Sequence, residues 1–185
     1  MGKLNVFNSV SLDGYFVDRA GDMGWAHNEA ADPDWDSFVN GNASGGALLV
    51  FGRVTYQMMA AWWPTPTAAQ NNPEVANGIN AAPKVVFSRT LRDASWNNTR
   101  VISGDLASEV RRLKRAGDVA VLGSGNVVSQ LVAEDLVDEL QLVVVPVILG
   151  SGRTMFEGLR GPLRMKRTST RAFRNGNVLL CYEPA

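Results

Sequence analysis

The residues best suited to ligand binding follow apolar runs that are typical of β-strands. Residues 47–51 (ALLVF) are followed by Gly52, Arg53 and Thr55, which offer a sharp turn, a fixed positive charge and a hydroxyl group. The N–H groups that begin the helix expected here can bind an anion. The pattern is compatible with an anion site at the end of the strand. An ordinary helix start with a solvated arginine is the alternative explanation.

A second strand end repeats the combination of hydroxyl and guanidinium groups. Residues 84–88 (KVVFS) end on Ser88, and Arg89 follows directly. An arginine beside a nucleotide ribose commonly selects the 2′-phosphate of NADP through paired hydrogen bonds. A solvated turn would explain the same residues without a ligand.

Two glycines follow a third apolar strand. Residues 118–122 (DVAVL) precede Gly123-Ser124-Gly125, and glycine lets the backbone approach a pyrophosphate closely. Val128 stands where the Rossmann fingerprint has its third glycine or alanine. The spacing therefore disfavours a standard Rossmann dehydrogenase, which would prefer NAD. The alternative to a phosphate site is a tight structural connection between strand and helix.

These turns belong to a chain in which strands and helices alternate. Strands are predicted over residues 3–11, 47–51, 84–88, 100–103, 118–122 and 140–149, and helices over residues 33–43, 53–63, 125–133 and after Asp105. Residues 65–72 are predicted to form a surface loop. Asn175-Gly176, between strands over residues 163–173 and 178–182, is typical of a type I′ hairpin turn. The pattern predicts one α/β domain over residues 1–185, a three-layer sandwich with a mostly parallel sheet and an antiparallel C-terminal hairpin.

Composition narrows the classes of function. The chain has 18 basic and 18 acidic residues, so no net charge attracts nucleic acid or an acidic membrane surface. Its apolar runs are shorter than the ~20 residues of a membrane span, and no signal peptide is evident. A single cysteine (Cys181) and a single histidine (His27) predict no disulfide and no zinc site. We therefore expect a cytoplasmic protein without a metal. The strand from residue 140 and the terminal hairpin could bury a homodimer interface or pack within one chain.

Four motifs, taken in order, resemble the dihydrofolate reductase-like superfamily. They are residues 11–14 (SLDG), 52–56 (GRVTY), 122–127 (LGSGNV) and 146–152 (PVILGSG), the last followed by Phe156. Within that superfamily they resemble the branch that contains the reductase domain of the bifunctional riboflavin-biosynthesis deaminase-reductase. The resemblance extends over residues 3–183.

The resemblance implies a reductase that uses NADPH. It places the 2′-phosphate at Arg53, Thr55, Ser88 and Arg89, the pyrophosphate at the Gly-x-Gly turn, and the nicotinamide near Val10 and the turn at Asp13-Gly14. The expected cofactor-binding residues are Val10, Gly14, Gly52, Arg53, Val54, Thr55, Ser88, Arg89, Leu122, Gly123, Ser124, Gly125, Asn126 and Val127.

The resemblance also implies a small pterin-like or pyrimidine-like substrate and a proton donor. Asp36 lies 17 residues before Arg53, a spacing similar to that of the folate enzymes. Asp34 faces another side of the same predicted helix, so we expect Asp36 to be the donor, with Asp13 as the second candidate. Both carboxylates have structural alternatives, as a helix N-terminal charge and as a turn residue.

Trp25, Tyr15 and Asp36 are the expected substrate-binding residues, although Trp25 could equally be a core aromatic. The basic residues that would hold a sugar phosphate are not evident near Asp13 or Trp25. The resemblance therefore supports the fold and the cofactor more strongly than it supports the substrate. A different class of function stays open: a catalytically inactive NADP-binding regulatory module.

Overall fold

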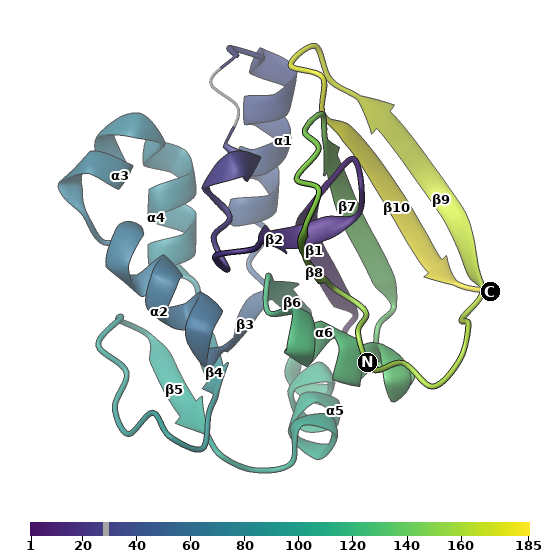
Figure 1. The fold of residues 1–185 in the computed structure, drawn as a ribbon. Helices are drawn as coiled ribbons and strands as arrows, with labels where there is room; N and C mark the ends of the chain where they lie inside the picture. Colours follow the sequence, from purple (N-terminus) through teal and green to yellow (C-terminus); the bar gives the residue numbers. More distant parts are fainter. Residues whose placement is uncertain (28–29) are drawn as a thin grey trace.

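The fold is seen in a computed structural model, which describes residues 1–27 and 30–185 (Figure 1). Its main sheet has eight strands in the order β5-β4-β3-β6-β1-β7-β10-β9. The strands are β1 (Leu4–Ser11), β3 (Leu48–Gly52), β4 (Lys84–Phe87), β5 (Thr99–Ile102), β6 (Val119–Leu122), β7 (Glu139–Val145), β9 (Met165–Ala172) and β10 (Val178–Pro184). The first six strands in that order are parallel to their neighbours, and β10 runs antiparallel to β7 and β9. This confirms the predicted α/β fold.

Helices cover both faces of the sheet. They are α1 (Pro33–Ala43), α2 (Arg53–Trp62), α3 (Pro66–Asn71), α4 (Pro73–Ala81), α5 (Leu106–Ala116), α6 (Gly125–Ala133) and the short 3-10 helix η1 (Gly24–Ala26). Along β3, Val50 belongs to the core under α5 and α6, whereas Leu49 and Phe51 belong to the core under α2 and α4. This alternation is what a strand buried on both faces requires.

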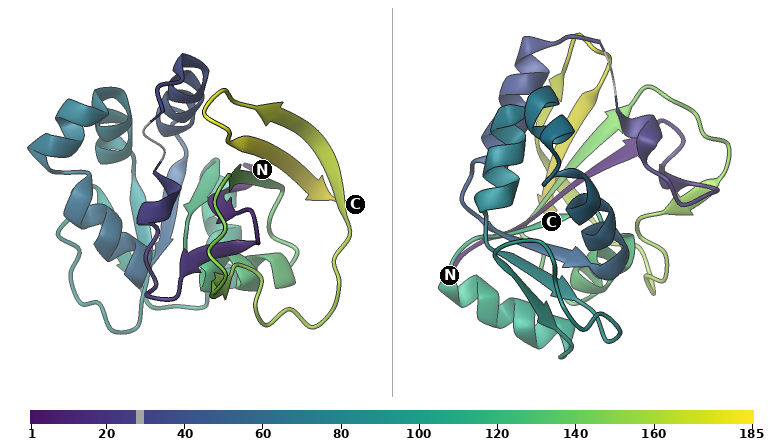
Figure 2. Two further views of the ribbon diagram at one scale, coloured as in Figure 1. Left: turned by 45° about the horizontal axis from the view of Figure 1, so that its top comes forward. Right: turned by 90° about the vertical axis from the view of Figure 1, so that its left-hand side faces the viewer.

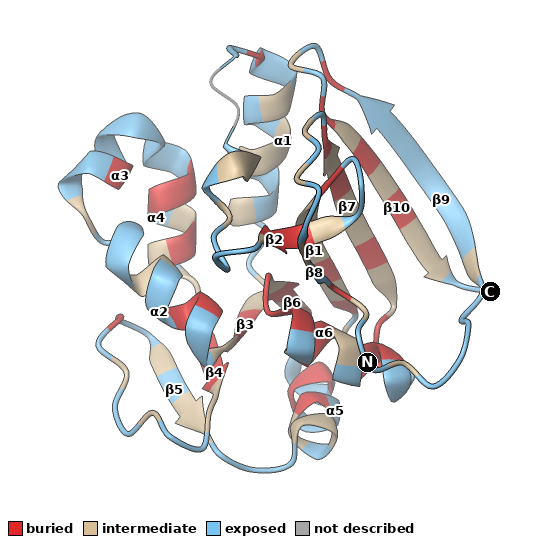
Figure 3. Cartoon of the chain, viewed as in Figure 1, coloured by how far each residue is buried: buried red, intermediate tan, exposed pale blue. Residues whose placement is uncertain are grey.

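The C-terminal hairpin forms one edge of the sheet, on the side away from α3 and α4 (Figure 2). β9 is exposed along nearly its whole length, whereas the inner strands are buried (Figure 3). A homodimer that covers this edge stays a prediction. No helix in the described part of the chain has both the length and the apolar character to cross a membrane.

The predicted surface loop over residues 65–72 is wrong. Pro66 and Pro73 each stand at the first turn of a helix, α3 and α4. Thr65 caps the first of these, because its Oγ1 accepts a hydrogen bond from the N–H of Ala68 at 3.2 Å. Proline lacks an N–H group that would in any case have no partner at a helix start, so these prolines begin helices here.

The predicted type I′ turn at Asn175-Gly176 is also wrong. A type I′ turn needs a positive φ at both central residues, but of these two only Gly176 has one, at +89°. The N–H of Gly176 instead donates to the carbonyl of Phe173 at 3.1 Å, and the N–H of Phe173 donates to the carbonyl of Asn177 at 2.9 Å. The loop is therefore longer than two residues.

A buried carboxylate connects this loop to α1. Oδ1 of Asp32 accepts the N–H groups of Asp34 at 3.0 Å and Trp35 at 3.3 Å, and its Oδ2 accepts the N–H of Asn175 at 3.1 Å. Burial raises the pKa of Asp32, but the N–H donors lower it by more, so it lies below 3.8. The side chain is therefore ionised at neutral pH and caps α1.

Replacing Asp32 with alanine is expected to lower the thermal unfolding midpoint by several degrees, because α1 loses its cap and the hairpin loop loses its acceptor. Circular dichroism melting measures this, with the exposed Asp34→Ala as control. The difference in unfolding midpoint between Asp32→Ala and wild type should be largest above pH 3.8. It should shrink as the pH falls through the lowered pKa of Asp32. Equal melting of the two variants would contradict this role.

Lys84 is a second buried charged residue, with 1% of its surface exposed. Its Nζ donates to the carbonyls of Ile79 at 2.8 Å, Asn80 at 3.1 Å and Ala82 at 2.6 Å, at the end of α4. The same atom lies 4.6 Å from the centroid of the Trp96 ring. Burial lowers the pKa of Lys84 from 10.5 to about 8.

The stability of the protein is therefore expected to rise between pH 8 and 10.5. In that range the unfolded chain still holds the proton on Lys84 and the folded chain has lost it, so raising the pH favours the folded state. Urea unfolding at about pH 7.5 and about pH 9.5 measures the change relative to Lys84→Met. An equal pH dependence in the two proteins would contradict the lowered pKa.

Candidate functional site

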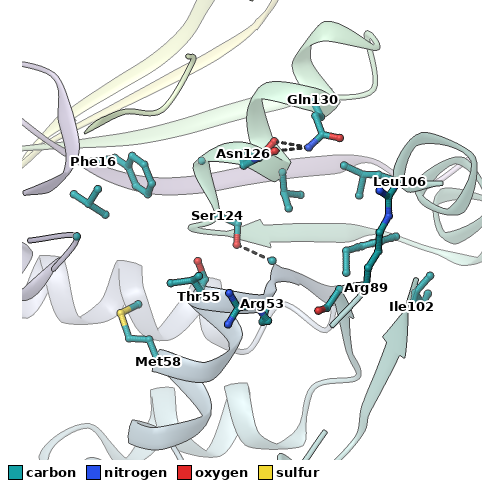
Figure 4. Close-up of a pocket in the computed structure, with 18 of the residues that line it drawn as sticks. Phe16, Arg53, Thr55, Met58, Arg89, Ile102, Leu106, Ser124, Asn126 and Gln130 are labelled. Atoms are coloured by element: carbon teal, nitrogen blue, oxygen red, sulfur yellow. Dashed lines mark hydrogen bonds between the residues drawn. The ribbon is translucent and has the colours of Figure 1, made fainter. Parts of the chain in front are cut away.

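A cleft of about 560 Å³ lies at the carboxyl ends of β3, β4, β5 and β6 (Figure 4). Parallel strands place these ends at one edge of the sheet, where the following helices begin. Ten of the predicted cofactor-binding residues line it: Gly52, Arg53, Val54, Thr55, Ser88, Arg89, Ser124, Gly125, Asn126 and Val127. The structure thus brings three separate turns of the sequence to one site.

A hydrogen bond joins two of these turns directly. The N–H of Gly52, before α2, donates to Oγ of Ser124, before α6, at 2.7 Å. Ser124 has a left-handed backbone, with φ at +63°, and its side chain is buried. Neither α2 nor α6 has a side-chain cap among the described residues. Both helix starts therefore offer N–H groups to an anion in the cleft.

The glycines of the second turn have a reason within the protein itself. Gly123 has φ at +63°, and a Cβ added there would lie 2.8 Å from Cγ2 of Thr55. A Cβ on Gly125 would lie 2.7 Å from Cε1 of Phe16. Packing against Thr55 and Phe16 therefore requires both glycines before any ligand is considered.

The charged residues that line the cleft are three arginines, Arg53, Arg89 and Arg153, and one aspartate, Asp105. Figure 4 shows Arg53 next to Thr55 at the start of α2 and Arg89 farther along the cleft toward Leu106. Arg53 donates from Nη1 to Oε1 of Gln57 at 2.9 Å, and no ion pair within the described ranges involves either arginine. Both guanidinium groups are therefore available to an anionic ligand.

Asp105 carries the negative charge of this region. Hydrogen bonds from Ser108, whose N–H lies 2.9 Å from Oδ1, hold the pKa of Asp105 below its usual value. The carboxylate is thus ionised and caps α5. Ser88 is engaged similarly, because its Oγ accepts the N–H of Leu91 at 2.9 Å and fixes the turn that carries Arg89.

Four predicted cofactor-binding residues do not line the cleft: Val10, Gly14, Leu122 and Gly123. Val10 packs partly against the core, and Gly123 lies against the side chain of Thr55. Gly14 is exposed in the turn after β1, with φ at +87°. Their roles toward a cofactor stay predictions.

Asp13 is held in a structural network. Its Oδ1 accepts the hydroxyl of Ser11 at 2.6 Å and the N–H of Leu149 at 3.1 Å, and its Oδ2 accepts the N–H of Gly150 at 2.8 Å. The Ser11 hydroxyl, more than these N–H groups, lowers the pKa of Asp13. A carboxylate that is ionised and joins two loops is poorly suited to donate a proton, so the geometry does not favour Asp13 as the acid.

Asp34 and Asp36 lie on different sides of α1. Oδ1 of Asp34 is 3.8 Å from Nη2 of Arg171, on the hairpin side. Val39, three residues after Asp36, packs against the cluster that contains Tyr56 of α2. Residues three apart share a helix face, so Asp36 lies on the side of α1 that carries Val39, and α1 packs against α4. Asp36 is exposed there and does not line the cleft.

The two predicted substrate-binding aromatic residues also lie outside the cleft lining. Trp25 packs partly against the core cluster that contains Val143 and Phe173, and its Nε1 donates to the carbonyl of Asp22 at 3.1 Å. Tyr15 pairs with Thr154 between two short strands, β2 (Tyr15–Asp18) and β8 (Gly152–Thr154). Core packing therefore accounts for part of the Trp25 side chain.

Sequence reasoning missed part of the cleft lining. Phe16 of β2, Met23 and Arg153 of β8 form one end of it, and residues 103–105 lie beside Arg89 at the other. The signal for residues 103–105 was present, since they follow a predicted strand and strand ends meet at one edge. The strands β2 and β8, with four and three residues, carry no such pattern.

No group of three His, Cys, Asp or Glu side chains that could hold a metal ion occurs in residues 1–27 and 30–185. Beside the carboxylate of Asp105 and the amides of Asn126 and Gln130, the polar groups that line the cleft are guanidinium, hydroxyl and backbone N–H groups. Such groups bind anions such as phosphates.

Comparison with known proteins gives a family and several structural neighbours. The family model described as the RibD C-terminal domain matches residues 2–179. The uncharacterized protein YyaP of Bacillus subtilis (strain 168) is 26% identical over 178 residues, which cover 94% of this chain and 90% of YyaP.

Solved structures share the fold at low identity. A putative riboflavin biosynthesis protein from Shewanella sp. PV-4 has a TM-score of 0.75 at 21% identity, with 99% of each chain covered. A diaminohydroxyphosphoribosylaminopyrimidine deaminase/5-amino-6-(5-phosphoribosylamino)uracil reductase from Thermotoga maritima has a TM-score of 0.70 at 16% identity, with all of this chain and 57% of that one covered. Dihydrofolate reductase from Enterococcus faecalis, complexed with NADP(H), has a TM-score of 0.64 at 14% identity, with 99% and 96% covered.

Proposed function

Because the chain belongs to the family of RibD C-terminal domains, we propose that it is an NADPH-dependent reductase of a small heterocyclic substrate, pterin-like or pyrimidine-like. The family and the fold both point to an oxidoreductase. The cofactor and the substrate class are our proposal. We further propose that the protein acts in the cytoplasm, as a homodimer.

The observation that carries the proposal is the convergence of three turns on one cleft. Arg53 and Arg89 would bind the adenosine 2′-phosphate, with Thr55 and Ser88 shaping that end. The helix start at Ser124-Gly125, joined to Gly52 by a hydrogen bond, would bind the diphosphate. Free guanidinium groups and uncapped helix starts suit the phosphates of NADPH in charge and in hydrogen bonding.

NADPH supplies the hydride when it is bound, so the protein must orient the substrate and supply a proton. We propose Asp36 for that proton, since it is exposed and lies 17 residues before Arg53, a spacing similar to that of the folate enzymes. Asp13 is the weaker candidate because its carboxylate already accepts three hydrogen bonds. The likeness to a dihydrofolate reductase and to a uracil reductase supports a heterocycle as substrate.

A titration combined with turnover tests the proposal. The wild-type protein is titrated with NADPH and with NADH, and the oxidation of NADPH is followed with dihydrofolate and with 5-amino-6-(5-phosphoribosylamino)uracil. We expect NADPH to bind at least about tenfold more tightly than NADH and one of the two classes of heterocycle to be reduced. Tight binding without turnover of either would instead favour an inactive NADP-binding regulatory module, and no binding of NADPH would overturn both functions.

A further inference from the structure

A third arginine lines the cleft at the end away from Arg89. Arg153 is on β8, where it pairs with Val17 of β2. Its guanidinium carbon lies 5.8 Å from the centroid of the Phe16 ring. Figure 4 shows Phe16 and Arg89 at opposite ends of the cleft, with Ser124 and Thr55 between them. Arg153 is therefore separated from the two arginines assigned to the 2′-phosphate.

Phe16 connects this arginine to the start of α6. The ring packs so closely on Gly125, the first residue of α6, that a Cβ there would lie 2.7 Å from Cε1. Arg153 lies over the same ring, so the Phe16 side chain contacts both the guanidinium group and the first residue of α6. A guanidinium group stacked on an aromatic ring is restrained in orientation while its N–H donors stay available.

We propose that Arg153 binds the diphosphate of the dinucleotide, together with the start of α6, and that Phe16 positions it. This inference rests on the proposed function and extends it with a binding residue outside the matched motifs. The ion pairs of the described ranges do not include Arg153, so its charge is not neutralised by a neighbouring carboxylate there. The cleft then has arginines at two separate phosphate positions.

The two arginine positions would bind different phosphates of the dinucleotide, so ligands that contain one or both of these phosphates distinguish them. NADPH and NADH both contain the diphosphate, whereas adenosine 2′-monophosphate contains only the 2′-phosphate. Arg153→Ala should weaken NADPH and NADH by the same factor, about tenfold, and leave the binding of adenosine 2′-monophosphate unchanged. Arg153→Lys keeps the charge, so its affinities for both dinucleotides should lie between those of wild type and of Arg153→Ala. Arg160→Ala, which changes a residue outside the cleft, should bind both dinucleotides as wild type does.

Phe16→Leu tests whether Phe16 affects dinucleotide binding by positioning Arg153 or only by packing in the protein. It should weaken both dinucleotides when Arg153 is present and have no further effect in the Arg153→Ala background, as a double-mutant cycle measures. Unchanged affinities in Arg153→Ala, or a change in the ratio of NADPH to NADH affinity, would overturn the inference while the proposed function stands. A wild-type protein that binds neither dinucleotide would overturn both.

Discussion

Replacing Asp36 with asparagine is expected to lower kcat by about 10²- to 10⁴-fold, the range that general acid catalysis contributes. Asparagine keeps the size of the side chain but has no acidic proton to give to the substrate. The affinity for NADPH should stay within about twofold of wild type, because Asp36 does not line the cofactor cleft. Steady-state kinetics with the heterocycle that the wild type reduces, and a separate NADPH titration, measure the two effects.

Asp34→Asn is the matched control, since Asp34 lies on the same helix turn but faces Arg171. It should leave kcat close to the wild-type value. The opposite result, in which Asp36→Asn keeps full activity and Asp13→Asn loses it without loss of stability, would assign the proton to Asp13. The hydrogen bonds of Asp13 to Leu149 and Gly150 make a loss of stability the expected result for that variant.

Removal of the two arginines at the 2′-phosphate position should abolish the preference for NADPH. In the double variant Arg53→Ala/Arg89→Ala we expect the affinity for NADPH to fall by about 100-fold and that for NADH to change by less than about threefold. In the proposed site each arginine would contribute a charge-assisted hydrogen bond to a phosphate that NADH lacks. Asp105 would then be the main charge at this end of the cleft and would favour a ribose hydroxyl group over a phosphate.

Titration calorimetry of both dinucleotides measures the preference. Arg115→Ala, an exposed arginine of α5 outside the cleft, serves as control. A double variant that still prefers NADPH by the wild-type factor would show that the 2′-phosphate is bound elsewhere.

Much of the architecture could be predicted from the sequence because its signals are local. The predicted strands over residues 47–51 and 118–122 are short and bounded by glycine, and they agree with β3 and β6 to within one residue. The helix predicted over residues 33–43 is α1, which begins at Pro33 after the cap residue Asp32. The carboxyl ends of parallel strands lie at one edge of the sheet, where the following helices begin. The predicted turns therefore lie in one cleft.

Other features could not be predicted from the sequence, because the contacts that decide them come from distant residues. Asn175-Gly176 has the local pattern of a two-residue turn, but Asp32, 143 positions away, holds the N–H of Asn175 in a longer loop. Asp13 looks like an exposed turn residue, yet its partners are Leu149 and Gly150. Gly125 looks like a phosphate-binding glycine, but it also accommodates Phe16. None of these partners is visible in a sequence window.

A crystal structure of the protein with NADPH tests the central claim most directly. It should place the 2′-phosphate within about 2.7–3.2 Å of guanidinium nitrogens of Arg53 and Arg89, and the diphosphate at the N–H groups that begin α6. The nicotinamide should then lie toward β1 and Phe16. A cofactor bound in the reverse direction, or bound with its 2′-phosphate away from both arginines, would contradict the assignment of this cleft.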